Sequence, residues 1–177
     1  LEMTSLSKEN YRLRTKEAIR VISTVFVGLT IASALAFMFA GMGPFDAVNH
    51  AFSVVSTGGF STKNASIGAF DSFAVELVAV VFMILGGMHF GLIYKTFSDR
   101  SAKLFRSPVT KLYLGTIVVV SVIISADLFI HGAGTGFWRT VWNSVFNVVS
   151  YISTTGFATV DCSVWPPLSI LMLMFLS

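Results

Sequence analysis

The chain has 177 residues, of which 54% are hydrophobic and only 12% are charged, and its mean hydropathy is +0.78. A globule of this length needs more polar side chains than these to cover its surface in water. The composition therefore excludes a soluble domain and predicts an integral protein of the lipid bilayer. The net charge of +3 is small, and the basic residues gather beside apolar segments. That placement is typical of cytoplasmic membrane flanks, so we expect no nucleic acid partner.

Residues 21–40 form the first apolar segment, and a helix of this length crosses about 30 Å of hydrocarbon. A basic cluster precedes it: Lys8, Arg12, Arg14, Lys16 and Arg20. No small-residue cleavage site follows the segment, so we do not expect a removable signal peptide. Because the last apolar run, 168–177, is too short to cross the bilayer, we expect the chain to be a fragment of a longer protein.

A shorter helix is predicted from Pro44 to about Ser56. Proline suits the first turn of a helix, and the carboxylate of Asp46 suits its positive N-terminal end. About a dozen residues extend only about 18 Å, which is roughly half a membrane. The polar loop 57–66 follows, and then Asp71 or Ser72 is expected to cap a third helix.

The same order recurs later in the chain. The apolar body of the third helix, 73–94, is expected to span the bilayer, as is the segment 112–130. A Gly-rich turn at 131–136, a short helix at 137–153 and a further span from Val164 then follow. The sequence predicts an all-α membrane protein with repeated units of helix, pore helix, filter loop and helix, in which the pore hairpins are re-entrant. We divide it into a cytosolic segment with a complete pore repeat (1–97), a basic cytosolic linker (98–111) and a second pore repeat truncated in its last helix (112–177).

A second basic cluster supports this order: Lys95, Arg100, Lys103, Arg106 and Lys111. If the short helices enter and leave on one face, both basic clusters lie on the same side of the membrane. Positive residues favour the cytoplasmic side, so we expect the N-terminus and residues 95–111 in the cytoplasm. The loops after the short helices are then on the outer face.

Two similar loops follow the two short helices, Thr57-Gly58-Gly59-Phe60-Ser61-Thr62 and Thr154-Thr155-Gly156-Phe157-Ala158-Thr159. Similar apolar sequences precede them, 49–56 and 143–150. One such loop alone is an ordinary turn after a helix. Its recurrence in register favours a shared task, although duplicated structural turns remain an alternative.

A filter for a dehydrated cation explains the residue types in these loops. Irregular backbone within a membrane is tolerated where it lines a pore, and glycine permits dihedrals that turn successive carbonyls to one side. Each short helix also directs its negative C-terminal end at the loop. The predicted ion-binding residues, by backbone carbonyl, are Thr57, Gly58, Gly59, Phe60, Thr154, Thr155, Gly156 and Phe157.

The two loops with their preceding helices resemble the filter regions of the Trk/Ktr/HKT superfamily of potassium transporters, most closely the bacterial TrkH type. The resemblance covers nearly the whole chain and implies the second repeat and most of the third of four repeats around one pathway. It implies K⁺ as the transported ion at the same residues, with no cofactor in this chain, in the cell inner (plasma) membrane. It further implies a homodimer and a cytosolic nucleotide-binding regulatory subunit that touches the linker 95–111. One departure is that Tyr151-Ile152-Ser153 has no counterpart in the first copy.

Other candidate residues carry weaker signals. Glu76 lies about a turn inside a predicted span, where it either pairs with Lys63 or Arg139 and braces the filter, or lies shallow enough to be hydrated. His50 and His89 are expected to be packing residues, since neither has a second metal ligand at a suitable spacing. Gly86-Gly87 either permits close helix packing or flexes the helix. Cys162 is expected to be a small loop residue, and the outer interface suits Trp138, Trp142 and Trp165.

No nucleophile with a matching base, phosphate-binding loop or metal pair appears, so the sequence does not indicate an enzyme. The predicted function is potassium, or monovalent cation, uptake through a filter of backbone carbonyls. Two alternatives remain at this stage: a sodium-coupled symporter, and a non-conducting structural or assembly subunit.

Overall fold

The computed structural model describes residues 2–98, 107–132 and 136–177, and over these residues it contains helices, turns and loops but no strand. The predicted all-α class is confirmed. Seven α-helices are described in chain order: α1 (Glu2–Phe39), α2 (Pro44–Val55), α3 (Phe73–Gly86), α4 (Phe90–Ser98), α6 (Pro108–Ile130), α7 (Phe137–Ile152) and α8 (Pro167–Leu176). Two 3₁₀ turns, η1 (Ser66–Phe70) and η2 (Cys162–Val164), lie in the loops after α2 and α7.

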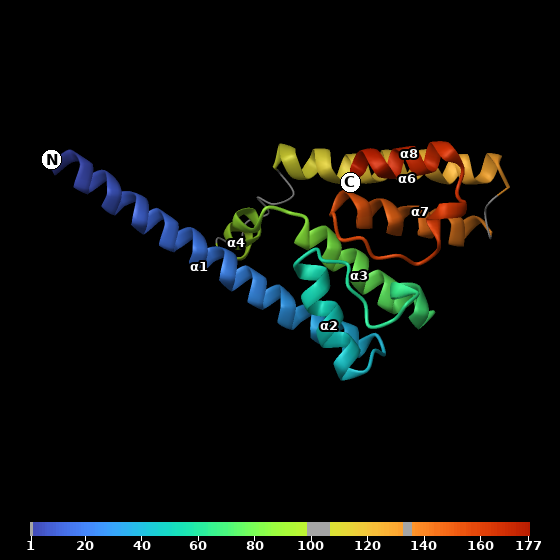
Figure 1. Ribbon diagram of the computed structural model, residues 1–177, viewed down its shortest axis with the longest axis horizontal. Coiled ribbons are helices and arrows are strands. Elements are labelled where there is room, and N and C mark those ends of the chain that lie inside the picture. The colour runs from blue at the N-terminus through green and yellow to red at the C-terminus, as the bar shows by residue number, and fades with distance from the viewer. Residues whose placement is uncertain (1, 99–106, 133–135) are drawn as a thin grey trace.

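The helices form two groups (Figure 1). In the first group α1 packs against α2, α3 and α4, and the N-terminal part of α1 extends away from the other helices. In the second group α6, α7 and α8 lie side by side. Packing of α3 against α7 joins the groups, so the third helix of one repeat supports the short helix of the next.

Two helices are long and apolar enough to cross a membrane, over Thr15–Phe39 and Pro108–Ile130. They agree with the predicted spans at 21–40 and 112–130. Helix α1 begins at Glu2, much earlier than the apolar segment alone predicts. The reason is that the basic N-terminal segment is rich in Lys, Arg and Glu, which have good helix propensity.

The predicted continuous span 73–94 is wrong. Helix α3 ends at Gly86 after 14 residues, and α4 begins at Phe90. A Cβ on Gly86 would lie 3.0 Å from the Val54 carbonyl oxygen, and one on Gly87 would lie 2.7 Å from the Tyr113 hydroxyl. The glycine pair therefore permits close packing, as predicted, and it also ends the helix.

Helix α8 begins at Pro167, three residues after the predicted start at Val164. Val164 instead ends η2, and Trp165 and Pro166 lie between that turn and the helix. Asp127 of α6 stabilises the new N-terminus, since its Oδ2 accepts hydrogen bonds from the Ser169 backbone N–H (3.1 Å) and hydroxyl (2.6 Å). Ser72 holds the N-cap position of α3 but makes no side-chain capping bond. The predictions for 99–106 and 133–135 lie outside the described residues.

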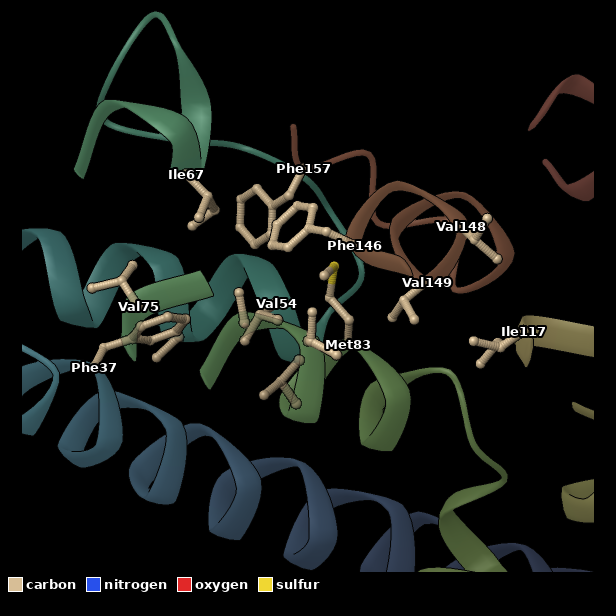
Figure 2. Close-up of a cluster of buried hydrophobic side chains, with 14 of the residues drawn as sticks. Phe37, Val54, Ile67, Val75, Met83, Ile117, Phe146, Val148, Val149 and Phe157 are labelled. Carbon is tan, nitrogen blue, oxygen red and sulfur yellow. The ribbon is translucent and has the colours of Figure 1, made fainter. Parts of the chain in front are cut away.

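One hydrophobic core joins the two groups of helices. Figure 2 shows side chains from both groups converging, among them Phe37 of α1, Val54 of α2, Met83 of α3 and Phe146 of α7. Phe157, from the loop after α7, lies in the same cluster and is 1% exposed. Burial of such side chains favours one fixed arrangement of the two repeats, because a closely packed core resists displacement of either half.

Candidate functional site

The short helix α2 ends in a capping motif that turns the chain sharply. Its C-cap is Ser56, in the right-handed helical region. The Thr57 N–H donates to the Val54 carbonyl oxygen (3.3 Å) and the Gly58 N–H donates to the Ser53 carbonyl oxygen (2.8 Å). This pair of bonds is the Schellman arrangement, which satisfies the last carbonyls of a helix when the next residue is left-handed.

The short helix α7 ends in the same motif. Its C-cap is Ser153, and the Thr154 N–H donates to the Tyr151 carbonyl oxygen (2.9 Å). The Thr155 N–H donates to the Ser150 carbonyl oxygen, also at 2.9 Å. The two predicted loops therefore begin with the same hydrogen bonds, and we call residues 57–62 the first loop and residues 154–159 the second loop.

Both loops begin with a strained threonine. The φ angles are +52° at Thr57 and +56° at Thr154, in the left-handed region that glycine normally occupies at this position. For a β-branched residue this conformation costs on the order of 1–3 kcal/mol, and such strain gathers at functional sites. The third residues, Gly59 and Gly156, also have positive φ, of +68° and +82°. Two turns with the same unfavourable residue in the same unusual conformation indicate a shared task.

Most of the predicted ion-binding carbonyl oxygens accept no hydrogen bond from any residue that the structure describes. They belong to Thr57, Gly58, Gly59, Phe60, Thr154, Thr155 and Gly156. The exception is Phe157, whose carbonyl oxygen accepts a 2.6 Å hydrogen bond from the buried Ser150 hydroxyl. Unsatisfied carbonyls in a membrane need water or an ion, so seven of the eight predicted groups are available for one.

The structure brings the two loops together. A Cβ built on Gly59 would lie 2.0 Å from the Thr155 carbonyl oxygen, so only glycine permits this approach. After the first loop, the Gly68 N–H donates to the Ala158 carbonyl oxygen (3.1 Å) and Ser66 Oγ accepts from the Ala158 N–H (3.2 Å). Loops far apart in the sequence thus lie against one another, with the C-terminal ends of α2 and α7 directed at the same region.

The register of the repeat differs from the sequence match. The two helices correspond from their capped ends, so Ser56 corresponds to Ser153 and not to Ser150. The additional residues Tyr151-Ile152-Ser153 are taken up within and at the end of α7, which has 16 residues against 12 in α2. Sequence similarity of 49–56 to 143–150 therefore does not reflect equivalent positions.

The structural register exposes a polar link that the sequence comparison missed. Thr62 Oγ1 donates to Asp46 Oδ1 (2.6 Å), and Thr159 Oγ1 donates to Asn143 Oδ1 (3.4 Å). Both pairs are 16 residues apart, so this spacing was the signal available in the sequence. In each copy, a side chain of the short helix, about three turns before its C-cap, holds the end of its loop.

The phenylalanines of the two loops have different surroundings. Phe60 is 82% exposed, whereas Phe157 is buried. The ring of Phe157 lies beside His50 of α2, with ring centroids 5.7 Å apart. The prediction of His50 as a packing residue is confirmed, but it also makes two hydrogen bonds that sequence reasoning did not anticipate.

Glu76 is fully buried at the start of α3 and pairs with Arg139 of α7, one of its two predicted partners. The guanidinium donates to both carboxylate oxygens, at 2.9 and 2.8 Å, and the Trp142 indole N–H donates to Oε2 at 2.5 Å. Lys63, the other predicted partner, pairs with Asp46 at 3.5 Å. The alternative of a hydrated Glu76 is wrong, and the carboxylate ties α3 to the short helix of the next repeat.

Cys162 lies half-buried in η2, after the second loop. Burial, and secondarily the Asp161 carboxylate, raises the pKa of the thiol to about 11. Because the thiolate is the reactive form, a raised pKa leaves little of it at pH 7.5.

We expect Cys162 in the full-length protein, with any other cysteines replaced, to react slowly with a membrane-impermeant maleimide. Asn64→Cys in a Cys162→Ala background, in the exposed part of the loop after α2, should react at least tenfold faster; equal rates would contradict the burial.

Together, the fold and the loops define an all-helical integral membrane protein built from a duplicated unit of helix, short helix and strained loop. The family model TrkH, described as a cation transport protein, matches residues 2–123. The chain belongs to the TrkH family.

Relatives and a solved structure agree with this membership. The chain is 36% identical over 167 residues to the Trk system potassium uptake protein TrkH of Escherichia coli K12. This match covers 93% of this chain and 35% of that protein. It is 31% identical over 153 residues to the Trk system potassium uptake protein TrkI of Halomonas elongata, and this match covers 86% of this chain and 31% of that protein. The crystal structure of the potassium transporter TrkH from Vibrio parahaemolyticus matches with a TM-score of 0.86 and 32% identity, over 92% of this chain and 36% of that one. The chain therefore spans about a third of the length of these relatives.

Proposed function

We propose that this chain forms part of a potassium uptake protein that conducts K⁺ through a filter of backbone carbonyls. The observation that carries the proposal is the pair of equivalent loops, each beginning with a left-handed threonine and lying against the other. Their seven free carbonyl oxygens, from Thr57 to Phe60 and from Thr154 to Gly156, are the groups that replace the hydration shell of the ion. Phe157 contributes its second lone pair, since Ser150 engages the first.

The ion moves passively, down its electrochemical gradient. The short helices α2 and α7 each direct about half an elementary negative charge at the loops, which favours cations over anions. Carbonyls held by strained caps keep their positions when the ion leaves, and a large, weakly hydrated ion gives up its water more readily than a small one. These features favour K⁺ over Na⁺ without a covalent or chemical step.

The domains and topology follow the charge distribution. The N-terminus and residues 95–111 lie in the cytoplasm, both loops open toward the outer face, and the protein resides in the inner membrane. The relatives are named as components of a Trk system, so we propose that the full-length protein acts with a cytosolic nucleotide-binding regulatory subunit on the linker side, and as a homodimer. K⁺ is cargo, and no cofactor is needed in this chain.

Reconstitution of the full-length protein tests the function. Liposomes loaded with K⁺ should take up radioactive rubidium, a tracer for K⁺, without a sodium gradient. An imposed sodium gradient should not increase the rate. Empty liposomes and liposomes with heat-denatured protein serve as controls.

Other outcomes identify the two rival functions. Uptake that requires the sodium gradient would identify a symporter. No cation flux from protein that is folded and correctly inserted would identify a structural or assembly subunit. Either result would reject the passive filter.

A further inference from the structure

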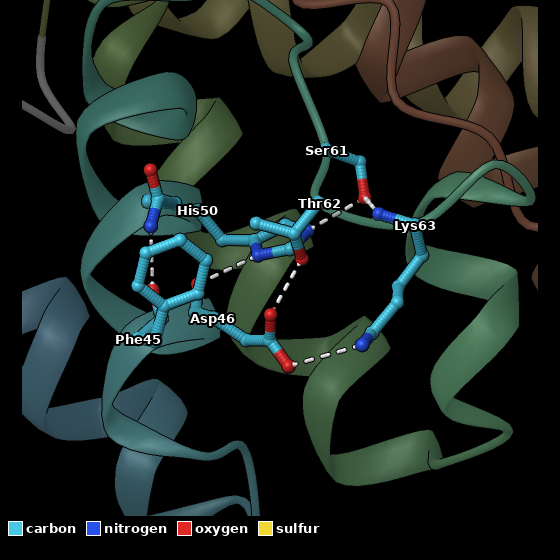
Figure 3. A network of polar contacts seen from close by, with 7 residues as sticks. Phe45, Asp46, His50, Ser61, Thr62 and Lys63 are labelled. Atoms are coloured by element: carbon cyan, nitrogen blue, oxygen red, sulfur yellow. Dashed lines mark hydrogen bonds and ion pairs between the residues drawn. The ribbon is translucent and has the colours of Figure 1, made fainter.

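His50 makes contacts that the proposed ion path does not explain. It lies on α2, it is 0% exposed, and Figure 3 shows it within a network of loop and helix residues. Its Nδ1 lies 2.7 Å from the Asp46 carbonyl oxygen, and its Nε2 lies 2.9 Å from Ser61 Oγ. A carbonyl oxygen can only accept, so Nδ1 carries the proton, and in the neutral ring the Nε2 lone pair accepts from the Ser61 hydroxyl.

The imidazole ring also touches the second loop. Its centroid lies 5.7 Å from the Phe157 ring, and the Phe70 ring stands edge-on at 5.3 Å. Phe37 of α1 contacts a further side of the ring, at 6.2 Å. One side chain therefore holds the first loop by a hydrogen bond and the second loop by packing.

The second copy of the unit lacks this arrangement. Counted from the caps, Asn147 corresponds to His50 and Ala158 corresponds to Ser61. Asn147 donates to the Asn143 carbonyl oxygen of its own helix (2.8 Å), and its Oδ1 has no partner among the described residues. The histidine and serine are thus a pair specific to the first copy and not a general requirement of the fold.

The two loops are held by different side chains. The second loop is fixed by the Ser150 bond to the Phe157 carbonyl oxygen. Its counterpart in the first copy, Ser53, is buried and has no hydrogen-bond partner among the described residues. The first loop is held instead by the hydrogen bond between His50 and Ser61. Ser61 directly follows Phe60, the last predicted ion-binding residue of the first loop.

We infer that His50 is a positioning residue that fixes the carbonyls of the first loop through Ser61 and couples them to the second loop through Phe157. The consequence for selectivity rests on the proposed function, whereas the coupling of the loops does not. Loss of the Ser61 bond should release the first loop alone. Loss of the histidine should release both loops, because the ring contact with Phe157 is lost with it.

Three variants of the full-length protein test the inference. Ser61→Ala removes the hydrogen bond to His50 together with the bond that Ser61 Oγ accepts from the Lys63 backbone N–H (3.1 Å), and it leaves the imidazole in place. His50→Asn introduces the residue of the second copy, which is too short to reach Ser61, and it leaves the Ser61–Lys63 bond intact. Asn49→Ala is the matched control, since this neighbouring side chain is exposed and donates only to the Phe45 carbonyl oxygen of its own helix. Amide hydrogen exchange of residues 57–66 and 154–159 is measured together with the ratio of K⁺ to Na⁺ flux.

We expect at least fivefold faster exchange in residues 57–66 for Ser61→Ala, because the variant loses the bond to His50 and the bond from the Lys63 N–H. For His50→Asn both segments should exchange faster, and each variant should lower the K⁺ to Na⁺ flux ratio by about fivefold. Asn49→Ala should match the wild type in both measurements.

Unchanged exchange of residues 57–66 in Ser61→Ala would overturn the inference, as would unchanged exchange of residues 154–159 in His50→Asn. If His50→Asn does not fold, Ser61→Ala decides, because its side chain lies on the loop. A wild-type protein with no potassium flux would reject the proposed function and the selectivity effect, while hydrogen exchange would still decide whether His50 holds the loops.

Discussion

Replacement of Glu76 by Gln is expected to destabilise the full-length protein by about 3 kcal/mol. The carboxylate is 0% exposed and accepts three hydrogen bonds, two from Arg139 and one from the Trp142 indole. A neutral amide keeps its size but leaves the guanidinium without a counter-charge. Arg139 lies in the first turn of α7, where the positive end of the helix adds to the penalty, although its 40% exposed side chain limits the loss.

Thermal unfolding of the purified protein measures this effect as a fall of several degrees in melting temperature. Arg139→Gln should have a similar effect, and the double variant should lose less than the sum of the two, because the partners share one interaction. Asp71→Asn is the matched control, since Asp71 is exposed and Asn tolerates its positive φ of 40°. Equal melting temperatures for Glu76→Gln and Asp71→Asn would show that the pair does not brace the repeats.

Replacement of Gly59 by Ser is expected to abolish the preference for K⁺ over Na⁺ and to reduce potassium uptake at least tenfold. The new Cβ would lie 2.0 Å from the Thr155 carbonyl oxygen, and the backbone has a φ of +68° that L-residues rarely adopt. The two loops must separate to admit the side chain. Separation moves the carbonyls of both loops, so the ion loses its matched set of ligands.

Gly58→Ser is the matched control for this prediction. Gly58 corresponds to Thr155, so the second copy already holds a side chain at this position. A Cβ on Gly58 would meet the Ser56 hydroxyl at 3.3 Å, the end of a side chain that can move. We expect Gly58→Ser to keep most of the uptake and selectivity. Flux of K⁺ and Na⁺ in liposomes distinguishes the two variants, and equal selectivity in both would argue that the loops are structural turns.

The internal repeat connects these predictions. Each copy contains a short helix, a Schellman cap, a left-handed threonine and a second threonine that bonds back to a side chain of the helix. The copies differ in the side chains that hold each loop, His50 in one and Ser150 in the other. Several sets of side chains can hold one backbone conformation. If the backbone carries the function, we therefore expect the two copies to share backbone geometry while different side chains stabilise it.

Membrane class, order of helices and loop positions were predictable from local sequence. The spans at 21–40 and 112–130 are long apolar runs, and Pro44 with Asp46 marks the start of α2. Length, hydropathy and capping residues act within a few turns of chain, so they need no tertiary information. The two loops could be chosen as the candidate site for the same reason, since their repetition is visible in the sequence itself.

The break after Gly86 was not predictable from hydropathy, because apolar residues continue on both sides of it. The glycine pair at the break packs closely against Val54 and Tyr113, which are distant from it in sequence, so this environment could not be read from the local pattern. The residue-by-residue correspondence of the two copies was not predictable for a similar reason. A sequence alignment favours identical residues, whereas the two short helices correspond when they are counted from their C-caps.

By itself, the sequence determined a membrane protein with two half-length helices and two Thr/Gly loops. The tertiary structure alone decided which charge pairs with Glu76, which side chains hold each loop and that Gly59 lies against Thr155. The physical reason is range: helix formation and hydrophobicity depend on neighbouring residues, whereas ion pairs and close backbone approaches depend on packing between segments that no local pattern relates.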